Sequence, residues 1–101
     1  MKKIINNKLY DTENCESIID FLTPVVYENI LGIKYYVHHH ATIYKTKKET
    51  YLKYVGEPKE LLSCPKKETL EIITKEELKK LLLQLNDVNT YIEEFGEVEE
   101  G

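Results

Sequence analysis

The sequence predicts an α+β domain in which a small antiparallel sheet of three to four strands packs against three helices. Two observations favour this fold class. Three stretches repeat apolar residues with the 3.6-residue period of a helix, and a longer stretch between them is rich in β-branched and aromatic residues. The expected order of elements is β-α-β-β-β-α-α, with a hairpin as an alternative to the first single strand. Because the chain has 101 residues and contains neither an internal repeat nor a linker, residues 1–101 are expected to form a single domain.

The first expected helix starts after Thr12, which can act as its N-cap, and ends before Pro24. The side chains on its apolar face are Cys15, Ile18, Ile19 and Leu22. The second helix follows the pair Thr74 and Glu77, whose T-x-x-E spacing predicts a capping box. Its apolar face consists of Leu78, Leu81, Leu82 and Leu85.

The third expected helix starts at Asn86 or Asp87, either of which can cap it, and ends at Gly96, which can adopt a left-handed conformation. Its apolar face consists of Val88, Tyr91, Ile92 and Phe95. The acidic residues 97–101 after it are expected to form a flexible tail.

Residues 33–46 are expected to form the main strand, and residues 51–55 a second strand paired with it as an antiparallel hairpin. On the main strand, one face is expected to carry Ile33, Tyr35, Val37, His39, Ala41 and Ile43, and the other Lys34, Tyr36, His38, His40, Thr42 and Tyr44. Residues 4–10 suggest a short hairpin with a turn at Asn6 and Asn7, and residues 69–73 a further strand.

The charge is unevenly distributed along the chain. The net charge is −4, which argues against a general nucleic-acid binder. Residues 82–101 contain six acidic residues and no lysine, whereas residues 44–68 contain seven lysines and four glutamates. The molecule is therefore expected to have a basic hairpin and an acidic C-terminus, and most of these charges are expected to lie on solvated faces.

No combination of residues in the sequence predicts an enzyme, and no cofactor is expected. His38 and His40 would share a strand face and could bind a metal, but no third ligand has a recognisable spacing, so no metal site is expected. Cys15 is interpreted as a small buried residue and Cys64 as a loop thiol, both reduced. Without a signal-peptide core or a long apolar stretch, the protein is expected to be cytoplasmic, in the host bacterium under the hypothesis below.

Three segments are similar to a known family. Residues 2–15, KKIINNKLYDTENC, resemble the opening K-K-I-I-N-G-K-x-Y-D-T-E-T-A. Residues 43–52 resemble the hairpin LYRTKKGxxFLY, and residues 94–100 resemble the ending I-F-G-E-V-E-E. The opening, hairpin and ending to which these segments are compared are found in small proteins of phages and mobile elements in Firmicutes and similar low-GC bacteria. The chain departs from that family at Glu49, where the family often has Gly, and at residues 57–59, where the family is Gly-rich.

The resemblance implies the β-α-β-β-β-α-α order and an accessory role in a phage, and proteins of this kind include anti-CRISPR inhibitors. The leading hypothesis is that the protein binds a CRISPR effector in the host cytoplasm and blocks its nucleic-acid binding or cleavage, without contacting a membrane. An acidic helix could occupy a groove made for phosphate. The residues expected to bind in this hypothesis are Asp87, Glu93, Glu94, Glu97 and Glu99.

The alternative hypothesis is a nucleic-acid-binding or regulatory module that uses the Tyr/Lys-rich hairpin, since tyrosines can stack on bases beside lysines that bind phosphates. Its expected residues are Tyr36, Tyr44, Lys45, Lys47, Lys48 and Tyr54. Tyr35 and Tyr51 are expected in the core. A monomer and a homodimer both remain open, and an exposed edge at residues 51–55 could pair across a two-fold axis.

Overall fold

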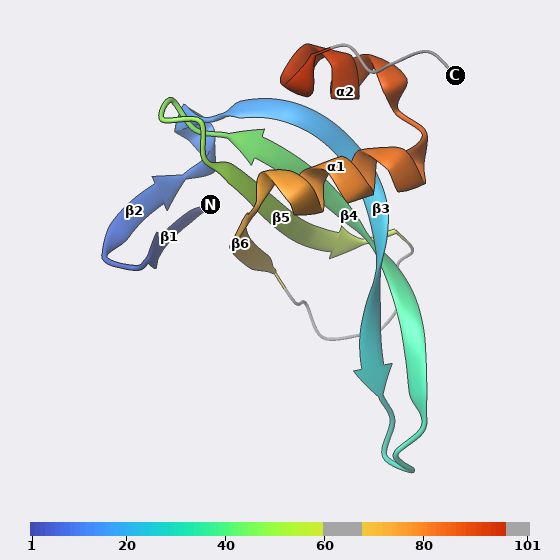
Figure 1. Ribbon diagram of the computed structural model, residues 1–101. Coiled ribbons are helices and arrows are strands. Elements are labelled where there is room, and N and C mark those ends of the chain that lie inside the picture. The colour runs from blue at the N-terminus through green and yellow to red at the C-terminus, as the bar shows by residue number, and fades with distance from the viewer. Residues whose placement is uncertain (60–67, 97–101) are drawn as a thin grey trace.

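The computed structural model describes residues 1–59 and 68–96 of the chain. Its elements confirm the α+β class (Figure 1). They are β1 (Lys2–Ile5), β2 (Lys8–Asp11), a 3-10 turn η1 (Thr12–Asn14), β3 (Glu16–Glu28), β4 (Lys34–Lys45), β5 (Tyr51–Pro58), β6 (Thr69–Ile73), α1 (Lys75–Leu85) and α2 (Val88–Phe95).

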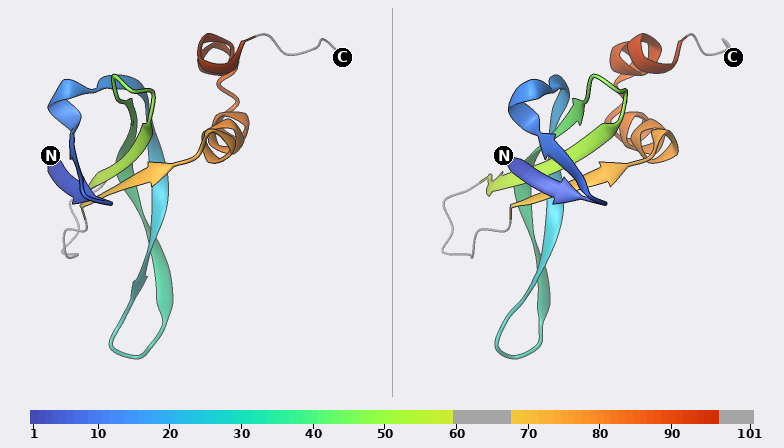
Figure 2. Two further views of the ribbon diagram at one scale, coloured as in Figure 1. Left: turned by 60° about the vertical axis from the view of Figure 1, so that its left-hand side comes forward. Right: turned by 90° about the vertical axis from the view of Figure 1, so that its left-hand side faces the viewer.

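The main sheet has the antiparallel order β3-β4-β5-β6, and β1 and β2 form a separate two-stranded sheet. Helices α1 and α2 cover one side of the main sheet, and the β1–β2 hairpin lies on the other side (Figure 2). The Lys3 ammonium donates to the Leu70 carbonyl across 3.1 Å and ties β1 to β6. Strand β5 lies between β4 and β6, so residues 51–55 are not an edge, and the expected pairing of two copies through them is wrong.

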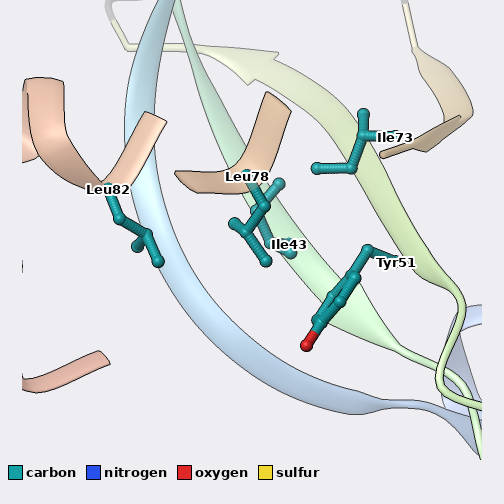
Figure 3. Packing of buried hydrophobic residues seen from close by; sticks show 5 residues of the cluster. All are labelled: Ile43, Tyr51, Ile73, Leu78 and Leu82. Carbon is teal, nitrogen blue, oxygen red and sulfur yellow. The ribbon is translucent and has the colours of Figure 1, made fainter. Parts of the chain in front are cut away.

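The core lies between the sheet and α1 (Figure 3). Leu78 and Leu82 point from α1 onto the sheet, where side chains of three neighbouring strands meet them. The buried cluster consists of Ile43, Tyr51, Ile73, Leu78 and Leu82. Burial of each such side chain contributes about 1.5–3 kcal/mol, so this cluster holds α1 to the sheet.

The turn signals of the sequence are confirmed at both ends of the chain. Asn6 and Asn7 have φ values of 50° and 64°, the left-handed pair that a two-residue hairpin turn requires. Thr74 and Glu77 form the capping box, with hydrogen bonds of 3.1 and 3.2 Å. Asp87 caps α2 by accepting from the Thr90 amide.

Asn86 and Gly96 lie at the C-terminal ends of the two helices. Asn86, which the sequence offered as an alternative N-cap, instead ends α1 in the left-handed conformation, with a φ of 54° and a ψ of 38°. Gly96 ends α2 with a φ of 86° and a ψ of −178°, a conformation that favours glycine. The predicted tail 97–101 lies outside the described residues.

The expected first helix is wrong, and so are the count of three helices and the β-α-β-β-β-α-α order. Residues 16–28 form strand β3, which has a register irregularity between Ser17 and Ile19. The spacing of Ile18 and Ile19 with their apolar neighbours fits one face of a helix. In the strand, the irregularity instead lets both side chains pack against the core. The segment is also rich in β-branched and aromatic residues, which favour a strand. Thr12 lies in the 3-10 turn, which Asp11 caps.

Pro24 does not end a helix but lies within the edge strand β3. The Asn29 amide donates to the Ile33 carbonyl across 3.0 Å, and ladder bonds recur at alternate residues, so odd-numbered residues of β3 bond to β4. The backbone nitrogen of Pro24 therefore faces away from β4, where a missing N–H breaks no ladder bond.

Candidate functional site

Strands β3 and β4 extend well beyond the rest of the sheet and form a two-stranded arm (Figures 1 and 2). Pairing of β4 with β5 ends where His39 faces Pro58, and the Lys59 amide donates to the His38 carbonyl across 2.7 Å. Pairing of β3 with β4 continues to Glu28 and Lys34. We call residues 22–40 the arm.

The end of the arm, residues 29–33, is held by its own hydrogen bonds. The Asn29 side-chain oxygen accepts from the amides of Leu31 and Ile33 at 2.9 and 3.0 Å. The Gly32 amide donates to the Asn29 carbonyl at 3.0 Å, and Gly32 adopts a φ of 77° that favours glycine. This ordered turn nevertheless exposes its apolar side chains, with Ile30 at 101%, Leu31 at 78% and Ile33 at 58%.

The face of the arm on the same side as the helices is closed around His39, which is fully buried. Its Nδ1 lies 2.8 Å from the Gly56 carbonyl, and its Nε2 lies 2.8 Å from the Tyr27 hydroxyl. Because a carbonyl can only accept, Nδ1 carries the proton, and in the neutral ring Nε2 accepts from Tyr27. Tyr27 also stacks on Tyr35 with ring centroids 5.7 Å apart. The contact of His39 with Gly56 fixes the base of the arm to β5, and the contacts of Tyr27 join β3 to β4 within the arm.

The opposite face of the arm is open, and we call it the arm face. Strand alternation places four directly opposed pairs on it, and all eight side chains are exposed. The pairs are Leu22–His40, Pro24–His38, Val26–Tyr36 and Glu28–Lys34. Tyr36, at 68% exposure, is the largest side chain among them. A surface with an exposed aromatic ring, imidazoles, aliphatic groups and few charges has the composition of a protein interface.

The histidine run is therefore divided between the two faces. His38 and His40 lie on the arm face, as the alternation predicted, and His39 is a buried structural residue. Among residues 1–59 and 68–96, no group of three or more His, Cys, Asp or Glu side chains could hold a metal ion.

The acidic residues predicted for partner binding have different roles within the fold. Glu94 accepts from the Lys45 ammonium at 3.2 Å and from the Tyr51 hydroxyl at 3.4 Å, and its side chain is only 9% exposed. Asp87 caps α2. Glu93 is exposed and free to meet a partner, whereas Glu97 and Glu99 lie outside the described residues.

The contacts of Glu94 shift two pKa values in the same direction. The hydrogen bond to Glu94 is the main cause that raises the pKa of Lys45 above 10.5. Burial, followed by the charge of Glu94, raises the pKa of Tyr51 above 10.0. Both shifts favour the protonated forms in the folded protein, so this cluster joins α2 to the hairpin at neutral pH.

The residues of the predicted Tyr/Lys surface do not lie together. Lys45 lies on the helix side in its ion pair, whereas Tyr44 and Tyr54 are half-buried on the other face of the sheet. Tyr36 lies on the arm, and Lys47 and Lys48 are exposed at the β4–β5 turn. Burial, followed by the charge of Glu68, raises the pKa of the Tyr54 hydroxyl.

The two tyrosines expected in the core have different outcomes. Tyr51 is buried, with 4% of its surface exposed, as predicted. Tyr35 is 42% exposed, so its expected place in the core is wrong. The reason is that Tyr35 lies on the arm beyond the end of β5, where its only described ring neighbour is Tyr27.

The N-terminal hairpin brings together a basic cleft that the sequence pattern did not reveal. The cleft has a volume of about 510 Å³ and lies between β2 and the β4–β5 turn. Four lysines line it, namely Lys2, Lys8, Lys47 and Lys48. Cys15 also lines it, and burial, followed by Asp11, raises the pKa of that thiol. Cys64 lies outside the described residues.

The arm was also missed by sequence reasoning, although one signal for it exists. Asn29 and Gly32 are turn residues in the middle of a run that otherwise favours strands.

Within the part of the chain that the structure describes, no helix is long and apolar enough to cross a membrane. No protein-family model, curated protein or solved structure matches the chain.

Proposed function

We propose that the protein is a non-enzymatic inhibitor that acts by binding another protein through the arm face. The particular version that the sequence resemblance favours is a phage-encoded anti-CRISPR protein. It would bind a CRISPR effector in the bacterial cytoplasm and block its nucleic-acid binding or cleavage. The observation that carries the proposal is the open arm face, a set of eight exposed side chains that includes Tyr36, on a projecting hairpin.

The arm suits this role because its binding conformation exists before the partner arrives. The Tyr27–His39–Gly56 contacts fix its base, and the Asn29 hydrogen bonds fix its end. Little conformational entropy is then lost on binding, which raises the affinity available from a small contact area. The long hairpin also lets the arm face enter a cleft that the body of the protein could not enter (Figure 1).

The acidic C-terminal region takes a secondary part in this proposal. Glu94 is held within the fold and Asp87 caps a helix, so only Glu93 among the described candidates is available for a partner. We assign to this region, with the net charge of −4, the steering of the protein toward a basic nucleic-acid channel. Steering of this kind makes association faster at low salt.

The test measures target-DNA cleavage by purified, guide-loaded CRISPR effectors of low-GC bacteria, titrated with the protein. The double variant Tyr36→Ala/His38→Ala is expected to weaken inhibition at least about tenfold, as loss of an interface hot spot does. Leu9→Ala, which truncates a side chain 66% exposed on β2, is the matched control and is expected to inhibit normally.

Two results would contradict the proposal in different ways. Full inhibition by the Tyr36→Ala/His38→Ala variant would show that the arm face is not the binding surface. Inhibition of no effector by the wild-type protein, at concentrations of about 10 µM, would remove the anti-CRISPR version and leave the arm face as a surface for another protein.

The basic cleft supports a second candidate function, binding of single-stranded nucleic acid. Its four lysines come from two hairpins and surround one concave surface. A gel shift at low salt, with Lys47→Glu/Lys48→Glu as the variant, tests it, and binding is expected to weaken as salt rises. Lys80→Glu, an exposed substitution on α1, is the control. Absence of a shift at micromolar protein would dismiss this candidate.

A further inference from the structure

We infer that two copies of the chain form a closed dimer in which the apolar end of each arm inserts into a groove between α1 and α2 of the other copy. The inference does not rest on the proposed function, because the residues that insert are 29–33, the end of the arm, and the arm face contributes only Lys34 at its edge. Two apolar surfaces, both uncovered among the described residues, carry it.

The first surface is the groove beside the turn that joins α1 to α2. It has a volume of about 110 Å³, and its lining is mostly apolar. Leu83, Val88 and Ile92 line it and are 69%, 54% and 38% exposed. An apolar cavity of about 150 Å³ is large enough to hold benzene. The groove is therefore of the size that one branched aliphatic side chain fills.

The second surface is the end of the arm, which presents such side chains. Ile30 and Leu31 protrude from a turn whose backbone is fixed by Asn29 and Gly32, and Ile33 lies beside them. An ordered turn that exposes three large aliphatic side chains would gain by burying them. Ile30, at 101%, is the most exposed of the three and is the residue that we assign to the groove.

The shape of the molecule places these two surfaces so that they meet in a second copy and not in the same one. The end of the arm and helix α2 lie at opposite ends of the protein in every view (Figures 1 and 2). The molecule is 48 Å long. A two-fold axis perpendicular to this length sets two copies side by side in opposite directions, so that each arm ends beside the other copy's α2. Such an arrangement is closed, with the same contact made twice.

The charges near the two surfaces favour this contact. Residues 86–96, which form the α1–α2 turn and α2, contain no basic residue, Asp87 lines the groove, and Glu93 is exposed on α2. Next to Ile33, the arm carries Lys34, which faces Glu28 across the two strands. Residues 29–33 carry no charge, so nothing repels them from the groove, and Lys34, which follows them, can approach Asp87 in its lining.

The experiment measures molar mass by light scattering across a chain concentration series up to about 200 µM, a range that detects micromolar dimers. The wild-type chain is expected to approach twice its mass of 11.9 kDa. Ile30→Asp in the arm and Val88→Lys in the groove are each expected to remain monomeric. Ile4→Asp, which charges an apolar side chain 70% exposed on β1, is the matched control and is expected to dimerise.

Mixing the two monomeric variants gives the sharpest result. In a mixed pair, the intact arm of the Val88→Lys chain can enter the intact groove of the Ile30→Asp chain, so one of the two contacts is restored. Dimers are expected to reappear in the mixture. Circular dichroism of each variant checks that the fold is unchanged.

Three results would overturn the inference. A wild-type chain that stays monomeric at about 200 µM has no such dimer. Dimers that persist in Ile30→Asp or Val88→Lys use another surface, such as the edge of β3. A ladder of larger species shows that the contact does not close on a two-fold axis.

Discussion

His39 shows how one buried polar residue fixes the base of the arm. The change His39→Phe keeps the ring but removes both the donor to the Gly56 carbonyl and the acceptor of the Tyr27 hydroxyl. We expect it to lower the free energy of unfolding by about 1–3 kcal/mol, the cost of a lost buried hydrogen-bond partner. Urea unfolding measures this change as a shift of the midpoint. His38→Phe, at the exposed neighbouring position, is the control, and equal midpoints for the two variants would contradict this role of His39.

The Lys45–Glu94–Tyr51 cluster predicts a loss of stability at alkaline pH. The folded protein raises the pKa of Lys45 above 10.5 and that of Tyr51 above 10.0, so both groups bind their protons more tightly folded than unfolded. Their contribution is therefore complete below about pH 10 and falls as the pH rises through the raised pKa values. Thermal unfolding between about pH 9 and 12 measures it.

Glu94→Gln provides the test of this cause. The variant removes the carboxylate that raises both pKa values, so its stability is expected to fall less steeply than that of the wild type in the same alkaline range. The slope is reduced and not abolished, because burial alone also raises the pKa of Tyr51. Glu93→Gln, at the exposed neighbouring position, is expected to retain the wild-type slope. An identical slope in Glu94→Gln would rule the explanation out.

At the scale of the element, the turn at the end of the arm should open independently of the body. Asn29→Ala removes the side-chain acceptor of the Leu31 and Ile33 amides. Amide exchange at these two positions is expected to become about tenfold faster, which corresponds to about 1.4 kcal/mol. Hydrogen exchange followed by NMR measures it, with Asn89→Ala as the control. A large fall in the melting temperature of Asn29→Ala would mean that the arm and body unfold together.

Most elements could be predicted from local signals, and the failures have a physical cause. The turn at Asn6 and Asn7, the capping box at Thr74 and the two C-terminal helices depend on neighbouring residues, which a sequence displays directly. Residues 16–28 failed because their apolar spacing fits both a helix and an irregular strand. Pairing with β4 decides between the two, and partners such as Lys45 for Glu16 or Ala41 for Phe21 lie too far along the chain to be visible in a local period.

At the scale of the whole molecule, the arm face exists because β3 and β4 continue beyond the point where β4 stops pairing with β5. This long-range feature explains why the sequence revealed only part of the surface. Alternation correctly placed Tyr36, His38 and His40 on one face. That this face is open, however, follows from the extension of β3 and β4 beyond β5, which ends near Pro58, and beyond the rest of the sheet. Glu94 shows the opposite case, since a residue that looked available in an acidic run is held by two distant partners.

Replacing the end of the arm by a short turn should leave the rest of the protein folded. Tyr27 and Tyr35 face each other in register, and by the alternation from Asn29 and Ile33 they form a hydrogen-bonded pair. Such a pair can be closed by a two-residue Asn-Gly turn. Replacing residues 28–34 by Asn-Gly would remove the apolar end of the arm and keep the His39 contacts and Tyr36. The buried cluster of α1 and the sheet lies elsewhere and should be unaffected.

We therefore expect the shortened chain to melt within a few degrees of the wild type, because a surface change away from the core alters stability little. It should be monomeric by light scattering, since Ile30 is gone. It should still inhibit its target, since Tyr36, His38 and His40 remain. If the shortened chain loses both dimerisation and inhibition, the end of the arm, or the dimer itself, is needed for binding. Loss of the fold would show that the arm is not an independent part of the molecule.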